Sequence, residues 1–157
     1  ITGIDNHKIK DVPISTVAGL IRSNKGPIIA IMHQYAYTGK GTSIHSSGQL
    51  EYHKSKVDDR SRAVGGKQMI VTIDNYAIPL NIRQGLPQLD MKCPTKKDME
   101  LYPHVILTSD TLWNPAVLDN EILEDEFENV NSDHVPYGPH KFNDTGDYIG
   151  INQHLIN

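Results

Sequence analysis

The chain has 157 residues, of which 38% are hydrophobic and 6% aromatic, and a formal net charge of -4. The length suits one domain with a tail, or a domain plus a small appendage, and the composition suits a modest core. Its single cysteine, Cys93, excludes an internal disulfide and a cysteine-based zinc cluster. No apolar run approaches the roughly 20 residues that a membrane-spanning helix needs.

The charge is distributed unevenly along the chain. Residues 1–97 hold 14 Lys and Arg against 7 Asp and Glu, whereas residues 98–157 hold 1 against 12. A basic segment followed by an acidic one indicates a nucleic-acid partner, or a tail that folds back on the basic face. Few aromatic residues lie among the basic ones, so a stacking platform for single strands is not indicated and a solvated face is the simpler interpretation.

A β-hairpin is expected near the start of the chain. Residues 12–22 are rich in β-branched and apolar residues, and residues 28–37 form a more continuous apolar run. Ser23-Asn24-Lys25-Gly26 between them supplies turn residues. We expect the second strand to be buried on both faces at its start and on one face at its end, and Gly19 to be a point where the first strand breaks.

The polar stretch 42–53 predicts a strand that enters a short helix through a turn. Ser46 or Ser47 suits the position that accepts a hydrogen bond from the first helical turn. Leu50 is the expected apolar anchor of this helix. On pattern alone, this is a surface helix between two sheets.

A second hairpin is expected over residues 67–73 and 76–82. Asp74-Asn75 suits a two-residue turn between these strands. Pro79 lacks a backbone donor, which favours an edge position for the second strand.

The rest of the chain contains shorter signals. Residues 88–92 are expected to form a short strand after a turn at Gly85. Thr95 and Asp98 form the pattern of a capping box, which predicts a helix through Leu101. A strand over 104–108 follows.

The C-terminal part is acidic and polar. Trp113 is expected to pack over the sheet edge, and residues 116–127 to form a short acidic helix. Residues 129–157 show no steady period, and we expect them to be disordered or nearly so.

No catalytic constellation stands out among the residues that carry chemistry. The eight histidines show no metal-ligand spacing, His45 and His53 are expected to be a surface pair, and Cys93 has no histidine nearby in the sequence. Asp144-Thr145-Gly146 spells the D-T-G of aspartic proteases, but Lys141-Phe142-Asn143 precedes it instead of an apolar strand, so chance explains the match better. No metal site and no cofactor are expected.

A family resemblance lies in the order of several segments. Residues 2–5 stand where a flap tip would lie, and residues 12–22 and 28–37 stand where two long strands would follow it. Residues 44–50 correspond to an apolar–Gly–polar segment with a short helix, and residues 57–80 correspond to later strands. This order resembles the retropepsin-like aspartic proteases of retroelement polyproteins, and most of all the protease segment of copia-type retrotransposons. The resemblance covers roughly residues 1–115.

The resemblance implies a mainly β fold, a partly closed barrel with one or two short helices. We expect residues 1–115 to be this domain, incomplete at its N-terminus, and residues 116–157 to be an acidic, disordered spacer. The family hydrolyses peptide bonds with two aspartates, one from each protomer of a homodimer. The family's Asp-x-Gly should lie upstream of Ile1, and Ser47-Gly48 replaces its apolar–Gly pair, so this chain by itself is expected to be inactive, with no catalytic residue.

Only substrate-covering roles are carried over from the family, to the flap residues Gly3, Ile4 and Asp5. The implied partners are peptide segments of the chain's own polyprotein and a second copy of the chain, with weak RNA contact through residues 1–97 and no membrane. The implied location is the cytoplasm, or the nucleus as part of a retroelement particle. One alternative is a non-catalytic, protease-like spacer or an assembly and RNA-contact module of the polyprotein; another is an unrelated small β domain that the acidic tail regulates.

Overall fold

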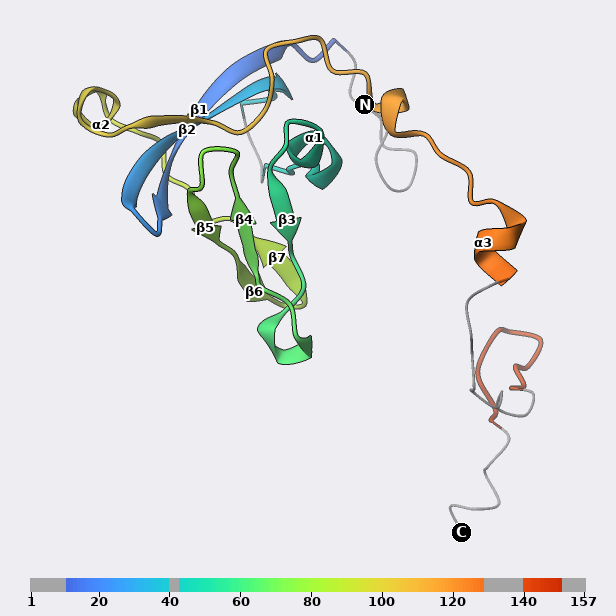
Figure 1. Ribbon diagram of the computed structural model, residues 1–157. Coiled ribbons are helices and arrows are strands. Elements are labelled where there is room, and N and C mark those ends of the chain that lie inside the picture. Colours follow the sequence, from blue (N-terminus) through green and yellow to red (C-terminus); the bar gives the residue numbers. More distant parts are fainter. Residues whose placement is uncertain (1–10, 40–42, 129–139, 151–157) are drawn as a thin grey trace. The chain divides into compact units, whose positions relative to one another are not determined.

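The computed structural model of the chain describes residues 11–39, 43–128 and 140–150. The chain divides into two compact units, Ile1–Asp119 and Asn120–Asn157. Figure 1 shows elements that are mostly short, in the order β1 (Ile14–Ser23), β2 (Gly26–Ala36), α1 (Ser47–Tyr52), β3 (Lys56–Asp58), η2 (Arg62–Val64), β4 (Met69–Val71), β5 (Ala77–Pro79), β6 (Asn81–Arg83), β7 (Leu86–Gln88), α2 (Lys96–Leu101), β8 (His104–Ile106), η3 (Pro115–Leu118) and α3 (Glu124–Glu128).

The two longest strands form the predicted antiparallel hairpin. β1 and β2 pair down to Ser23↔Gly26, and Gly26 has a φ of 101°, a conformation that glycine adopts without strain. The Ser23 hydroxyl closes the turn by donating to the Gly26 carbonyl at 2.7 Å. The expected break at Gly19 is wrong, because β1 continues through it; a Cβ there would overlap the side chain of Met91, so the glycine serves close packing.

The third strand of this sheet comes from much later in the chain. β8 pairs in parallel with β2, giving the order β1-β2-β8, and Leu107 N–H extends the ladder by donating to the Ile31 carbonyl at 2.9 Å. β2 is therefore the central strand. Its residues 28–30 are buried in succession and burial then alternates, which confirms the predicted change from two buried faces to one.

The remaining strands form two smaller antiparallel sheets, β3-β4-β5 and β6-β7. The predicted hairpin of β4 and β5 is present, and Pro79 lies in the edge strand β5. Its turn is longer than the expected two residues: Thr72 N–H donates to the Tyr76 carbonyl at 2.9 Å, and Asn75 takes a φ of 64°.

The strand expected over residues 88–92 is misplaced, because β7 covers Leu86–Gln88 and Lys92 forms an isolated bridge with Leu20. Gln84 and Gly85 both have positive φ, at 53° and 77°. Two such residues make the tight turn that joins antiparallel strands directly. The chain therefore returns at once and pairs as β7 with β6.

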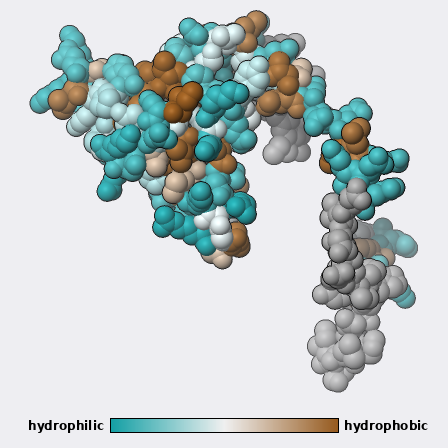
Figure 2. Space-filling view, in the orientation of Figure 1, coloured by the Kyte–Doolittle hydropathy of each residue, from teal (hydrophilic) through white to brown (hydrophobic). Residues whose placement is uncertain are grey.

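One hydrophobic core joins the β1-β2-β8 sheet to the β3-β4-β5 sheet and to α1. Its buried members are Ile21, Ile28, Ala30, Met32, Leu50, Ile70, Ile78, Leu80, Val105 and Leu107. The mainly β fold with short helices is confirmed, and the described strands form separate sheets without a closed barrel. On the face drawn in Figure 2, hydrophobic patches are interrupted by hydrophilic side chains.

The helices after β7 are all short. Thr95 and Asp98 form the predicted box at the start of α2. The acidic helix expected over 116–127 is instead the two short helices η3 and α3, because Asp119 takes an extended conformation with ψ of 127° and ends the first. Among the described helices, none has the length and apolar content that crossing a bilayer requires.

Candidate functional site

The end of β2 contains a β-bulge. Ser15 pairs with Tyr35 and Val17 with Met32, so β2 advances by one residue more than β1 over this interval. Gln34 lies within the bulge with a φ of 59°. A left-handed conformation costs a non-glycine residue roughly 1–2 kcal/mol, and such strain persists where surrounding groups hold it, often at functional sites.

Helix α1 packs beside this bulge and begins as the sequence predicts. The Ser46 hydroxyl accepts a hydrogen bond from Gln49 N–H at 3.2 Å, and Leu50 is buried in the core. A Cβ on Gly48 would lie 2.7 Å from Leu118 of η3, so the helix and η3 pack closely. The expected strand before the helix is not present, since residues 43–46 are irregular.

Two buried side chains bind the carbonyls of the bulge. Gln49 Nε2 donates to the carbonyls of His33 and Gln34 at 3.3 and 3.4 Å. Thr108 Oγ1 donates to the same His33 carbonyl at 2.7 Å. Because Gln49 is 8% exposed and Thr108 is 0% exposed, these bonds lie away from water. We call the bulge, Gln49 and Thr108 the α1 junction.

A tyrosine and a histidine form a neutral pair next to the α1 junction. Tyr35 Oη and His45 Nδ1 are 3.1 Å apart, and the rings lie 5.7 Å apart. Burial raises the pKa of Tyr35 to about 12 and lowers the pKa of His45 below its usual 6.5. The phenol can therefore donate to an unprotonated imidazole at pH 7. The surface pair expected for His45 and His53 is replaced by this half-buried contact.

The junction has the properties of a positioning site. Its backbone carbonyls, amide and hydroxyl hold one another in place, and the phenol–imidazole pair lies beside them. Within the described parts of the chain, no group of three or more His, Cys, Asp or Glu could hold a metal ion.

The flap residues Gly3, Ile4 and Asp5 fall outside the described residues. The triplet at 144–146 lies in an exposed turn, where Asn143 Oδ1 accepts hydrogen bonds from Thr145 N–H at 3.1 Å and Asp147 N–H at 2.8 Å. These bonds make the triplet part of a capped turn.

Trp113 packs against a helix and not over the sheet edge. Its ring lies 5.4 Å from the ring of Tyr52, at the end of α1, with an angle of 54° between the planes. The expectation failed because the segment after β8 returns to α1, a long-range arrangement that local pattern does not encode.

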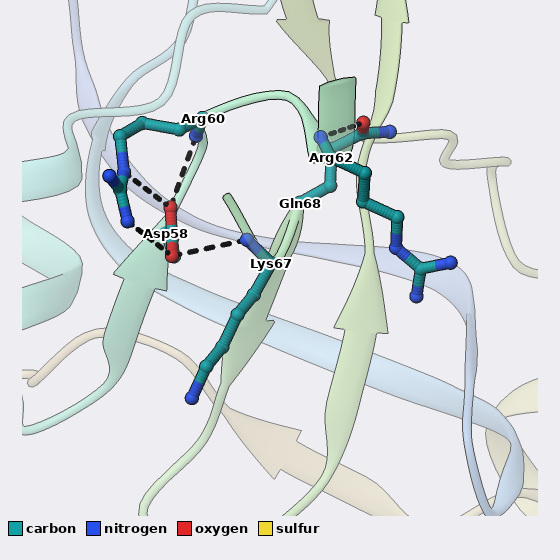
Figure 3. A network of polar contacts seen from close by, with 5 residues as sticks. All are labelled: Asp58, Arg60, Arg62, Lys67 and Gln68. Carbon is teal, nitrogen blue, oxygen red and sulfur yellow. Dashed lines mark hydrogen bonds and ion pairs between the residues drawn. The ribbon is translucent and has the colours of Figure 1, made fainter. Parts of the chain in front are cut away.

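A second polar cluster surrounds Asp58 at the end of β3 (Figure 3). Arg60 Nε lies 3.2 Å from Asp58 Oδ1, and Lys67 N–H donates to Oδ2 at 3.1 Å. The hydrogen bond from the Arg60 side chain is the main cause that lowers the pKa of Asp58. Beside this pair, Arg62 N–H donates to Gln68 Oε1 at 3.1 Å.

Sequence analysis did not identify Gln34, Gln49, Thr108 or the cluster around Asp58 as site residues. Comparison of the chain with protein-family models, curated proteins and solved structures finds no match.

Proposed function

We propose that this chain is part of the retropepsin-like protease domain of a copia-type retrotransposon polyprotein, which hydrolyses peptide bonds when intact. In that mechanism two carboxylates share a proton and activate a water molecule. The described residues do not present such a pair, so the proposal places the catalytic aspartates outside them. The chain's own contribution is the scaffold around the catalytic centre.

The α1 junction is the observation that carries the proposal. In the proposed family, the segment equivalent to 44–50 forms the wall behind the catalytic aspartate. Here Gln49 attaches this segment to the end of the long hairpin through a buried hydrogen bond to the His33 carbonyl, and Thr108, which follows β8, binds the same carbonyl. A wall that must hold a reacting group to within a fraction of an ångström needs such support from surrounding residues.

The hairpin of β1 and β2 suits the strands that follow a flap. Gly3, Ile4 and Asp5, the proposed flap residues, precede β1 in the chain. A peptide segment of the polyprotein would lie extended beneath the flap and form backbone hydrogen bonds with strand edges. A second copy of the intact domain would supply the other aspartate, and the particle would work in the cytoplasm.

The proposal is tested with the longest open reading frame that contains this chain. The aspartate of an Asp-x-Gly motif preceding Ile1 is changed to Asn, and self-cleavage is followed by gel electrophoresis and mass spectrometry. We expect the wild-type protein to cleave itself and the Asn variant to remain uncut. Asp144→Asn is the matched control, because Asp144 lies in an exposed turn and its change should leave cleavage intact.

The absence of any Asp-x-Gly motif in that reading frame, or equal cleavage by both proteins, would overturn the protease proposal. The non-catalytic spacer that contacts RNA would then be the better function. Its basis in the structure is a basic cleft that is separate from the α1 junction.

A further inference from the structure

A cleft of about 490 Å³ lies between the turn of the first hairpin, the loop after η2 and the segment that joins β5 to β6. Its lining includes two arginines and three side-chain amides: Arg22, Arg62, Asn24, Gln68 and Asn81. No carboxylate belongs to the lining. The cleft lies within the unit Ile1–Asp119.

Side-chain amides fix the walls of the cleft. Asn24 clamps the hairpin turn onto β5, since its Oδ1 accepts from Ala77 N–H and its own N–H donates to the Ala77 carbonyl, both at 2.9 Å. Gln68 Nε2 donates to the Leu80 carbonyl at 2.8 Å while its Oε1 holds Arg62 N–H. The cleft is therefore preformed, which lowers the entropy that a ligand must offset.

Among the described residues, the two arginines of the cleft differ from their neighbours in having no carboxylate partner. Arg60 is paired with Asp58, and Arg83 Nη1 lies 2.8 Å from Asp90 Oδ1. In the described parts of the chain, by contrast, the guanidinium groups of Arg22 and Arg62 make no hydrogen bond or ion pair. Figure 3 shows the Arg62 side chain extending away from the Asp58–Arg60 pair.

Two acids near the cleft, Asp58 and Asp90, are bound by other basic residues. Asp58 is bound by Arg60 and by Lys67 N–H. Asp90 is bound by both terminal nitrogens of Arg83. It also accepts a hydrogen bond of 2.6 Å from Nδ2 of Asn81, which lines the cleft. The cleft thus presents two free guanidinium forks beside amide groups, a combination that matches the charge and the planar hydrogen-bonding geometry of a phosphate group.

We propose that this cleft binds a phosphate group through Arg22 and Arg62, either as the phosphodiester of an RNA strand or as a small phosphate. This inference does not depend on the protease proposal, because no residue of the α1 junction contributes to the cleft.

The experiment uses the full 157-residue chain with two probes. A fluorescein-labelled uridine 12-mer is titrated by anisotropy, and inorganic phosphate is titrated by amide NMR against chloride of equal ionic strength. The test variant is Arg22→Gln with Arg62→Gln. The control is Lys96→Gln with Lys97→Gln, which removes the same charge from the exposed helix α2.

We expect the test variant to lose at least tenfold in affinity for one or both probes, and the control to change by less than about twofold. Loss of the one phosphate contact that the two arginines share should also reduce the slope of log affinity against log salt for RNA by about 0.7, the value for one phosphate of a single strand. Phosphate should shift the side-chain amide resonances of Asn24 and Gln68 in the wild-type protein.

Each pattern of results has a definite meaning. Dependence on the two arginines in the RNA arm alone assigns the cleft to a phosphodiester, and dependence in the phosphate arm alone assigns it to a small phosphate. Equal behaviour of test and control variants in both arms, or no binding by the wild-type chain, overturns the proposal. Circular dichroism checks the fold, and Arg22→Lys with Arg62→Lys, which keeps the charges, should restore part of the affinity.

Discussion

Removing both side-chain donors from the His33 carbonyl should cost more stability than the two single changes predict. Thr108→Val replaces a hydroxyl by a methyl group of similar size, and Gln49→Met removes an amide while keeping the length of the side chain. Each single change leaves the carbonyl one buried donor, because Thr108 and Gln49 share it. In the double variant, the His33 carbonyl has lost both of these side-chain donors.

The size of the effect follows from burial. A typical intramolecular hydrogen bond contributes about 1 kcal/mol net, so Thr108→Val should lose about that much free energy of unfolding, and Gln49→Met, which also removes the bond to the Gln34 carbonyl, about 1–2 kcal/mol. A buried polar group that loses its last partner costs roughly 1–3 kcal/mol for lost solvation. The double variant should therefore exceed the sum of the single losses by about 1 kcal/mol or more.

Urea unfolding followed by circular dichroism and by Trp113 fluorescence gives the four free energies of this double-mutant cycle. Trp113 reports on the junction because it packs on Tyr52 at the end of α1. Thr111→Val is the control, since Thr111 is exposed and should change stability by less than about 0.5 kcal/mol. Additive losses within about 0.3 kcal/mol would refute the shared-acceptor reasoning.

Three further predictions concern burial and charge. Leu50→Ala should lower the free energy of unfolding by about 2–5 kcal/mol, because Leu50 is 3% exposed. Leu101→Ala is the control and should change this free energy little, because Leu101 is 63% exposed. Urea unfolding measures both variants. Ser55→Ala should be neutral or stabilising by calorimetry, since the buried Ser55 hydroxyl has no hydrogen-bond partner in the described structure; a loss above about 1 kcal/mol would contradict this. The lowered pKa of His45 means that the unfolded chain takes up the proton first as pH falls through 6.5, so stability should decrease from pH 7 towards pH 5. His45→Asn should flatten the Tm profile over that interval, and an unchanged profile would exclude His45 as the source.

Local interactions explain which parts of the fold the sequence predicts. The turn at Asn24 and Lys25 and the capping box of Thr95 and Asp98 are set by residues that contact one another within a few positions. The parallel pairing of β8 with β2 joins segments that lie far apart in the chain, and nothing in residues 104–108 specifies that partner.

The candidate sites were harder to predict, because each depends on long-range geometry. The left-handed conformation of Gln34 could not be predicted from the sequence. A glycine at this position would have indicated it, because glycine adopts such a conformation readily. In the sequence, Thr108 has the pattern of an ordinary strand residue. Its contact with the His33 carbonyl depends on the pairing of β8 with β2. Arg22 and Arg62 belong to a scattered basic set, and only the fold shows that Arg60 and Arg83 acquire carboxylate partners while, within the described residues, Arg22 and Arg62 do not.

The two sites should therefore respond differently to salt. The hydrogen bonds of the α1 junction join neutral groups that are shielded from water, and added ions do not screen such contacts appreciably. The guanidinium groups of Arg22 and Arg62 are exposed, and at about 0.15 M salt charges in water are screened over about 8 Å. Raising the salt concentration should weaken phosphate binding at the cleft while the energetic coupling between Gln49 and Thr108 stays constant. A coupling energy that fell in parallel with phosphate affinity would mean that the sites are not independent, and would connect the basic cleft to the scaffold of the proposed protease.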